Sequence, residues 1–471
     1  MLSKNDFCTL VTNFLTFSLT EGQHRALQQL AVFICENSDN QLFILKGYAG
    51  TGKTSLLSAI VKSLKHIGQR TVLLAPTGRA AKVFSSYARA KAYTIHKMLY
   101  RISMKDGVLR VNRRENKAHN VLFIVDEVSM LSSSPIGNLS PRSLLDDLMQ
   151  FVYEGDNCKM IFVGDDAQLP PVHSDESPAL DIAFLQRNFS VDIDSCILTE
   201  VVRQANNSGI LFNANILRKK IVQEKYDFPL FSKQPFPDLL RVNGIDLEEL
   251  LNTLYSKYNT EELVIITRSN KRAYFFNEEI RRRILFRDNT IEAGDYLMIV
   301  KNNYYWVDEV SEVGFLANGD IMEILSINKR EELYGFHFAD VTVRLCDYPD
   351  FEHIDIKIIL ESLESPEASM PTTQHQLLYE QVALDYEDIK DRRLRALKVK
   401  NSPYLNAVQV KFSYSLTCHK TQGGQWQVVL VDKGFIPNNT FDKEYLRWLY
   451  TALTRATEMV YLINFEDENF G

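Results

Sequence analysis

Short apolar runs, each bounded by turn-forming residues, recur along the chain and predict its strands. Runs of this kind are typical of strands buried on both faces of a parallel sheet. Between the first two runs, residues 55–67 have the three-to-four-residue apolar spacing of a helix. Strands that alternate with helices predict α/β layers around a parallel sheet. The predicted strands cover 41–46, 71–76, 121–125, 159–163, 195–198, 263–266 and 427–431.

Two blocks of this alternation predict two lobes, and the chain within the second block changes its pattern. The first block covers 20–215, and the second covers 216–275 and 405–471. Residues 291–347 are rich in β-branched and aromatic residues that alternate with polar ones, and the Asn-Gly-Asp at 318–320 is a hairpin-type turn. We therefore expect a small β-barrel inserted into the second lobe, followed by a charged helical return.

A second insert is predicted in the first lobe, at 97–118. Apolar stretches at 99–104 and 108–111 flank a Lys-Asp-Gly sequence at 105–107. Two extended stretches joined by such a turn predict a β-hairpin. The alternative is a solvent-exposed insert with no part in the chemistry.

The composition fits a multidomain globular protein. A chain of 471 residues corresponds to about two to four domains. No apolar run approaches the ~20 residues of a membrane span, and the apolar stretch at 7–17 predicts a first helix rather than a signal peptide. The six cysteines lie far apart without a C-x-x-C pair, which argues against a zinc site or a disulfide framework and favours a cytoplasmic protein.

The net charge of −7 weighs only weakly against a nucleic-acid partner. A motor needs a local basic track and must also release its substrate. Basic clusters lie at 113–114, 218–220, 281–283 and 392–400. The alternative interpretation of each cluster is a solvated helix face.

The strongest local signal for chemistry is a glycine-rich sequence, Gly-Tyr-Ala-Gly-Thr-Gly-Lys-Thr, which follows a predicted strand and opens a helix. Its glycines let backbone N–H groups surround phosphates, and the helix N-terminus favours an anion. Lys53 would neutralise the β- and γ-phosphates of a nucleotide, and Thr54 would ligate Mg²⁺. The strand–helix context disfavours a chance match to a glycine-rich turn. The predicted nucleotide-binding residues of this loop are Gly47, Gly50, Thr51, Gly52, Lys53 and Thr54.

The predicted strand at 121–125 is followed by two acidic residues, Asp126 and Glu127. A carboxylate at this strand end lies beside the phosphate loop in parallel sheets, so Asp126 can hold Mg²⁺. Glu127 can then orient or deprotonate the attacking water. Alone, an acidic pair after a strand is as readily a helix cap. The phosphate loop upstream favours the catalytic interpretation.

Three further polar residues complete the predicted catalytic set. Gln168 follows the strand at 159–163 and is placed to sense the γ-phosphate. Arg203 and Arg455 each lie among small or apolar residues. One such arginine is usually structural, whereas two in a chain with a phosphate loop suggest cations placed at the γ-phosphate from a facing lobe.

A series of motifs, in this order, resembles the superfamily one helicases. The Asp-Glu-Val-Ser-Met and Gln-Leu-Pro-Pro sequences resemble branch B of that superfamily, the RecD-like, Dda-like and PIF-type enzymes. The resemblance covers about 20–215 and 405–460 well, and the middle only loosely through 318–320. The motifs are Gln23, the phosphate loop, 75–81, 94–96, 126–130, 164–170, Arg203 with Gln204, 419–423 and 450–455.

The resemblance implies a fold of two RecA-like parallel-sheet lobes of the P-loop NTPase class. A β-hairpin would interrupt the first lobe and a small SH3-like β-barrel the second. The expected segments are 1–96, 97–118 (the hairpin) and 119–215 for the first lobe, and 216–276, 277–404 (the barrel) and 405–471 for the second.

The resemblance also implies an activity. A monomeric motor would hydrolyse ATP with Mg²⁺, translocate 5′-to-3′ on single-stranded DNA and unwind forked duplex DNA in replication, recombination or repair. The hairpin would be the pin that splits the duplex, and the barrel a clamp that helps the pin engage. The DNA track would comprise Pro76, Thr77, His96 and His419.

At the nucleotide, the resemblance assigns Gln23 to the adenine edge, because an amide is donor and acceptor together. It also places Gly423 and Gln425 there. RecD-like members often have an acidic residue, held to contact the ribose, at the position of Gln425. A neutral amide can still bond a hydroxyl, but this departure leaves the nucleotide preference open. Trp426 is interpreted as core packing of the second lobe rather than a base-stacking residue.

Two other functions stay open. One is a DNA-dependent ATPase that remodels or displaces DNA-bound protein without processive unwinding, and a projecting hairpin at 97–118 would disfavour it. The other is an RNA helicase or a regulatory nucleotide-binding module. The intact set of Lys53, Glu127, Gln168 and Arg455 argues against a module that does not hydrolyse nucleotide. DNA rather than RNA rests on the family resemblance.

Overall fold

The computed structural model gives backbone and side chains for most of the chain. At 102–105 and 108–111 only the backbone is described. The described residues are 3–36, 40–105, 108–135, 142–172, 174–201, 208–227, 230–232, 234–308, 311, 313–436 and 441–471.

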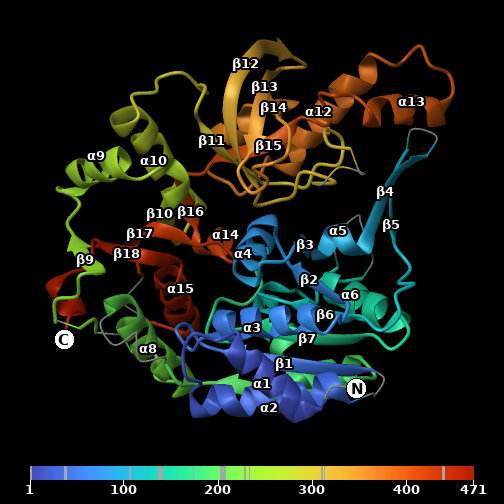
Figure 1. Cartoon of the computed structure of the whole chain (residues 1–471). Coiled ribbons are helices and arrows are strands. Elements are labelled where there is room, and N and C mark those ends of the chain that lie inside the picture. The colour runs from blue at the N-terminus through green and yellow to red at the C-terminus, as the bar shows by residue number, and fades with distance from the viewer. Residues whose placement is uncertain are drawn as a thin grey trace.

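The first lobe is built on a six-stranded sheet in the order β3-β2-β6-β7-β1-β8, with parallel pairing throughout the described strands (Figure 1). The central strands β6 and β7 are buried along their whole length, which explains their continuous apolar sequences. The strands are β1 (Gln41–Gly47), β2 (Thr71–Ala75), β3 (Ala92–Thr94), β6 (Leu122–Val125), β7 (Lys159–Gly164) and β8 (Asp192–Leu198).

Helices cover both faces of this sheet, because successive side chains of a strand point to opposite sides. Phe43 and Leu45 of β1 pack in one core cluster with α1 to α4, whereas Leu42 and Ile44 pack in another with α5 to α7. The helices are α1 (Lys4–Asn13), α2 (Glu21–Cys35), α3 (Lys53–His66), α4 (Gly78–Ala88), α5 (Ile95–Leu99), α6 (Leu144–Glu154) and α7 (Ile182–Asn188).

A two-stranded hairpin of β4 (Tyr100–Lys105) and β5 (Val108–Arg113) projects from the first lobe (Figure 1). The two strands confirm the predicted hairpin, and the turn at 106–107 lies outside the described residues. The hairpin base is fixed to α6, since Arg113 pairs with Glu154 at 2.8 Å. Leu99, which was expected in the hairpin flank, instead ends α5 and is fully buried in the lobe core.

The second lobe has a parallel five-stranded sheet in the order β16-β10-β17-β18-β9. Its strands are β9 (Leu239–Val242), β10 (Leu263–Thr267), β16 (Ser415–Thr417), β17 (Trp426–Asp432) and β18 (Ala456–Ile463). Its helices are α8 (Gly209–Val222), α9 (Leu247–Lys257), α10 (Asn270–Glu279), α14 (Cys418–Thr421) and α15 (Lys443–Leu453).

A small closed barrel interrupts the second lobe, as predicted. Its inward apolar side chains, Val341 and Val343 among them, are fully buried. The strand that closes it, β15, lies beyond residue 404, where the barrel insert was expected to end, and leads directly into β16 of the lobe sheet. The barrel strands are β11 (Tyr296–Ile299), β12 (Ile321–Leu333), β13 (Phe336–Leu345), β14 (Ile354–Ile359) and β15 (Val408–Phe412).

The charged stretch between β14 and β15 is helical, as expected from its sequence. It forms α11 (Glu361–Glu364), α12 (Thr372–Leu384) and α13 (Arg392–Lys400). Leu378 and Val399 of these helices pack against Phe338 of the barrel. No helix in the described part of the chain is both long and apolar enough to cross a membrane.

Candidate active site

The carboxyl ends of three neighbouring strands of the first sheet, β6, β7 and β1, meet the second lobe at a cavity of about 770 Å³. The cavity collects side chains that lie far apart in the sequence and come from both lobes. Nine of the predicted residues line it: Gly50, Gly52, Lys53, Thr54, Asp126, Glu127, Gln168, Gln425 and Arg455.

The glycine-rich loop between β1 and α3 forms one wall of this cavity. Gly50 (φ 74°) and Gly52 (φ 77°) have left-handed backbone conformations that glycine adopts without strain. Gly47 is required for another reason: a Cβ there would lie 2.7 Å from Cγ of Lys53. The Lys53 ammonium donates to the carbonyl oxygens of Gly47 and Tyr48, the latter at 3.0 Å.

The acidic pair at the end of β6 is held in a specific geometry. Glu127 has φ 53°, a left-handed conformation that costs a non-glycine residue about 1–3 kcal/mol. Its backbone N–H donates to one carboxylate oxygen of Asp126 at 2.8 Å, and the Tyr87 hydroxyl donates to the other. Desolvation in the cleft raises the pKa of the Glu127 carboxyl, and the positive charge of Arg455 opposes this shift.

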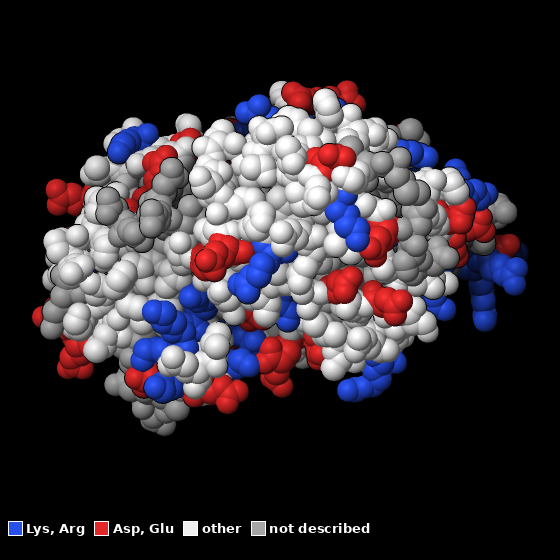
Figure 2. All heavy atoms as spheres, turned by 60° about the horizontal axis from the view of Figure 1, so that its bottom comes forward, with Lys and Arg blue, Asp and Glu red and all other residues white. Residues whose placement is uncertain are grey.

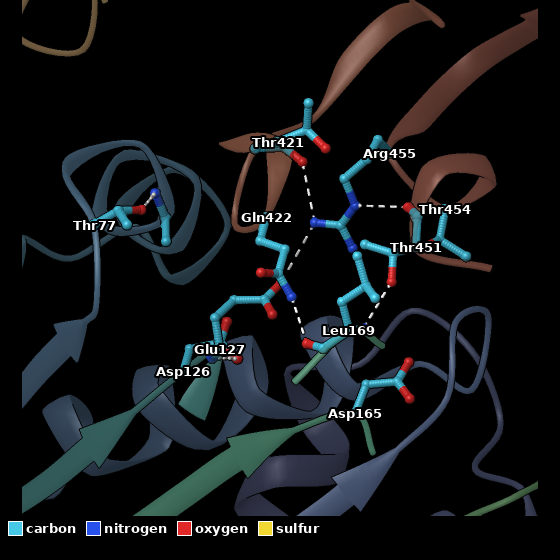
Figure 3. A network of polar contacts seen from close by, with 12 residues as sticks. Thr77, Asp126, Glu127, Asp165, Leu169, Thr421, Gln422, Thr451, Thr454 and Arg455 are labelled. Carbon is cyan, nitrogen blue, oxygen red and sulfur yellow. Dashed lines mark hydrogen bonds and ion pairs between the residues drawn. The ribbon is translucent and has the colours of Figure 1, made fainter. Parts of the chain in front are cut away.

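Arg455 reaches this acidic pair from the second lobe (Figure 3). Its guanidinium lies 3.9 Å from Oε1 of Glu127. It is held in place by donating to the carbonyl oxygens of Thr451 at 3.2 Å and Gly424 at 3.3 Å. A buried arginine that is 5% exposed and tied to its own backbone is a preorganised cation at the boundary of the lobes.

The second lobe holds the loop after β7 by hydrogen bonds to both backbone polar groups of one residue, Leu169 (Figure 3). The Leu169 N–H donates to the Thr451 hydroxyl at 2.9 Å, and its carbonyl accepts from the Gln422 amide at 2.6 Å. The neighbouring Gln168 lines the cavity, and its buried Oε1 has no hydrogen-bond partner among the described residues. Movement of the second lobe would therefore displace the backbone directly beside Gln168.

The donor set of the cavity fits a magnesium ion bound together with nucleotide phosphates. Mg²⁺ typically takes one or two carboxylates and completes its shell with phosphate oxygens and water. The Thr54 hydroxyl and the Asp126 carboxylate both line the cavity and could supply its protein ligands. Within the described ranges no group of three or more His, Cys, Asp or Glu residues gathers as a metal site, and a nucleotide-bound Mg²⁺ requires none.

Comparison with known proteins places these observations in a family. Two family models match the chain, an AAA domain over residues 18–225 and a UvrD-like helicase C-terminal domain over residues 412–463. Together they cover more than half of it and include both walls of the cavity. The chain belongs to branch B of the superfamily one helicases. It is an ATP-hydrolysing enzyme.

Relatives of this helicase span nearly its full length at low identity. Protein R530 of Acanthamoeba polyphaga mimivirus is 24% identical and covers 93% of this chain and 98% of its own. The ATP-dependent DNA helicase dda of Enterobacteria phage T4 is 26% identical, and the alignment covers 90% of this chain and 93% of the phage protein. A crystal structure of a Pif1 helicase from Bacteroides aligns at 17% identity over 96% of this chain and 94% of that one, with a TM-score of 0.47.

Three of the residues predicted to form the DNA track of this helicase lie at one edge of the first sheet. Pro76 and Thr77 follow β2, and His96 follows β3, which is in register with β2 through the pair Ala75–Thr94. Thr77 caps α4 by accepting from the Ala80 N–H. Burial lowers the pKa of His96 to about 4, so its imidazole is neutral at physiological pH.

The fourth predicted track residue, His419, lies in α14 of the second lobe and is half-buried. Desolvation lowers its pKa. Gly423, a few residues later, was expected at the nucleotide. Instead it lies beside the start of α4, where an added Cβ would be 2.8 Å from the Ala80 Cβ and 3.3 Å from the Thr77 hydroxyl. Gln425 does line the cavity, whereas Gly423 does not.

Gln23, the residue expected to read adenine, does not line the cavity in the described structure. It is fully buried, and its amide makes two bonds: Oε1 accepts from the Thr20 N–H at 3.0 Å, and Nε2 donates to the carbonyl of Thr51 at 2.9 Å. Contact with an adenine would require the amide to exchange these bonds. Arg203, the other predicted arginine finger, lies outside the described residues.

Tyr450 is a site residue that sequence reasoning missed. Its hydroxyl donates to the carboxylate of Asp165 at 2.6 Å and accepts from the backbone N–H of Ala49 in the phosphate loop at 2.8 Å. One buried hydroxyl of the second lobe thus joins two loops of the first. The signal was present, because Tyr450 begins the motif that ends in Arg455, but a tyrosine in an apolar helix is typical of core packing.

Helix α4 of the first lobe forms much of the remaining contact with the second. The Arg79 guanidinium lies 3.8 Å from the ring centroid of Trp426, which is 4% exposed. Trp426 packs in the core of the second lobe, as the sequence suggested. Gly78 approaches the barrel so closely that an added Cβ would lie 2.7 Å from the carboxylate of Asp320.

Most of the predicted basic clusters that the structure describes have structural partners. The buried Arg281 pairs with Asp295 at 3.0 Å, and Arg283 pairs with Glu279 at 2.7 Å. Figure 2 shows a face on which Lys and Arg are interspersed with Asp and Glu rather than gathered into one basic surface. For these clusters the solvated or paired helix face is the better interpretation.

Proposed function

We propose that this helicase hydrolyses ATP between its lobes to translocate 5′-to-3′ on single-stranded DNA and unwind forked duplex. The observation that carries the proposal is the position of Arg455. This cation of the second lobe lies 3.9 Å from Glu127 of the first, in the cavity that also contains the phosphate-loop residue Lys53. Hydrolysis at such a site depends on lobe closure, which is what a stepping motor needs.

The residues of the cavity suggest a division of roles. Lys53 would neutralise the β- and γ-phosphates, and Thr54 and Asp126 would hold Mg²⁺, which neutralises charge on the phosphate oxygens. Glu127 would orient or deprotonate the attacking water, because its carboxylate lies in the cavity beside Asp126. Gln168 would contact the γ-phosphate. Arg455 would stabilise the charge that develops in the transition state.

The DNA assignment rests on the relatives. The phage T4 relative is named an ATP-dependent DNA helicase, and the branch B motifs support 5′-to-3′ polarity. Thr77 and Gly423, which approach each other across the lobes, support a strand track that crosses the lobe boundary. The projecting β4–β5 hairpin is the candidate pin that separates the strands.

We further propose a monomeric motor that acts in replication, recombination or repair. The six cysteines are free in the structure, which supports a reducing compartment such as the cytoplasm.

The test measures ATP turnover and strand separation on duplexes that carry either a 5′ or a 3′ single-stranded tail. We expect DNA-stimulated turnover on both and separation only from the 5′ tail. Lys53→Ala should abolish turnover and leave single-strand binding largely intact. Separation from the 3′ tail would refute the polarity. Turnover without separation on either tail would favour the alternative, an ATPase that displaces DNA-bound protein.

A further inference from the structure

Tyr87 is a cavity residue to which the proposed division of roles assigns no function. It lies at the end of α4, and its hydroxyl donates to the carboxylate of Asp126. It lines the nucleotide cavity and also an adjoining cavity of about 410 Å³ between α4 and the second lobe. Its hydroxyl therefore contacts the predicted Mg²⁺ carboxylate where the two cavities adjoin.

The Tyr87 ring and backbone are both fixed. The ring stacks on that of Phe84, with centroids 5.1 Å apart and planes inclined by 27°. Its backbone carbonyl accepts from the Ser58 hydroxyl at 2.6 Å. Ser58 belongs to α3, the helix that begins at Lys53. The hydroxyl is thus held relative to the phosphate-loop helix as well as to β6.

The contact leaves Asp126 bonded on both oxygens. One accepts from the Glu127 N–H at 2.8 Å and the other from Tyr87, which together fix the plane of the carboxylate. Each carboxylate oxygen has two lone pairs, so both bonds leave capacity for a metal ion. Groups that orient a ligating carboxylate in this way strengthen metal binding.

We propose that Tyr87 is a positioning residue for the magnesium site, holding the Asp126 carboxylate in the orientation that receives the ion. This rests on the proposed function, in which Asp126 holds Mg²⁺. The tyrosine would act through the carboxylate and would not touch nucleotide or metal itself.

Tyr87→Phe tests the role, because it keeps the ring packed on Phe84 and removes only the hydroxyl. ATP turnover would be measured against Mg²⁺ concentration. Binding of Mn²⁺ in the presence of ADP would be followed by electron paramagnetic resonance. Loss of an outer-shell partner typically weakens metal affinity roughly 10–100-fold. We expect weakening of that order in both measurements, with most of the turnover recovered at saturating Mg²⁺ and unchanged nucleotide affinity without metal.

Two further variants distinguish positioning from general loosening of the lobe. Tyr153→Phe removes a comparable hydroxyl hydrogen bond, 3.0 Å to the carbonyl of Gln41, away from the cavity, and should leave the metal dependence unchanged. Ser58→Ala frees the Tyr87 backbone and should weaken Mn²⁺ binding in the same direction by a smaller factor.

Wild-type Mn²⁺ affinity in Tyr87→Phe would overturn the proposal, as would an equal loss in Tyr153→Phe. Because Mn²⁺ binding is read without turnover, it decides the role of Tyr87 even if ATP hydrolysis itself is not observed. Absence of turnover in the wild-type protein would instead refute the proposed function.

Discussion

Glu127 combines a strained backbone with a carboxylate placed between Asp126 and a cation of the other lobe. Glu127→Gln should bind ATP with near-normal affinity and hydrolyse it roughly 10²–10⁴-fold more slowly, because an amide cannot accept the proton of the attacking water. Nucleotide binding and steady-state turnover, measured on the same preparation, check this. A variant that fails to bind nucleotide would identify Glu127 as a structural residue.

Asp320 predicts a pH dependence of stability. Burial, aided by the charge of Asp347, raises its pKa from 3.8 to about 8. Between these values the folded protein holds a proton that the unfolded chain releases, so stability falls as the pH rises through this window. Asp320→Asn keeps the acceptor for the Ala317 N–H and cannot ionise.

The urea midpoint of Asp320→Asn should therefore exceed that of the wild-type protein by an amount that grows from about pH 4 to pH 8. Asp350→Asn, at an exposed position, should show no such growth. If the urea midpoints of the wild-type protein and of Asp320→Asn changed with pH in parallel, this would contradict the raised pKa.

Residues whose chemistry is carried by a local motif could be placed from the sequence, and those defined by distant partners could not. The predicted Lys53, Asp126, Glu127, Gln168 and Arg455 all line one cavity. Tyr87 and Tyr450 are separated from their carboxylate partners by 39 and 285 positions, and no local pattern links them.

At the scale of a single element, the β4–β5 hairpin is expected to serve duplex opening and not translocation. Translocation requires the cleft and the track, whereas opening a duplex requires a wedge that replaces stacking on the last base pair, whose loss costs a few kcal/mol. Replacing residues 101–110 by a short Gly/Ser linker should reduce strand separation about tenfold or more. DNA-stimulated turnover should stay near normal, because Arg101, the residue of this segment whose side chain the structure describes, does not line the cavity.

Fork unwinding and translocation on a single strand would be measured side by side for this variant. Unimpaired unwinding would place the pin elsewhere. Joint loss of turnover and translocation would mean that the hairpin belongs to the track or the fold.

Strands that are wholly buried could be predicted from their apolar runs, whereas the short edge strands β3, β9 and β16 could not. The edge strand β9 has one buried residue in four, so its sequence has no apolar run. The segment that forms β15 was predicted as part of the second lobe, which was expected to resume at residue 405. Its pairing with β11 and β14, more than a hundred and about fifty residues earlier, places it in the barrel.

At the scale of the whole molecule, catalysis should depend on a cation that the second lobe supplies to the acidic pair of the first. Arg455→Ala should bind ATP with near-normal affinity and lose about 10³-fold or more in turnover, as expected for a cation supplied across a lobe boundary. Arg455→Lys should recover only part, because an ammonium lacks the guanidinium fork. Single-turnover hydrolysis would check this, and turnover near the wild-type rate in Arg455→Ala would exclude the two-lobe mechanism.

Because Arg79 of the first lobe stacks on Trp426 of the second, the fluorescence of Trp426 should report whether the lobes are in contact. The ring is 4% exposed while the lobes touch, and it would meet water when α4 withdraws. In a Trp306→Phe, Trp448→Phe background Trp426 is the only indole left of the three tryptophans. Its fluorescence emission should shift to longer wavelength as the lobes separate. The emission maximum should therefore move to longer wavelength and back with each catalytic cycle, and a constant spectrum through the cycle would mean that this contact stays closed.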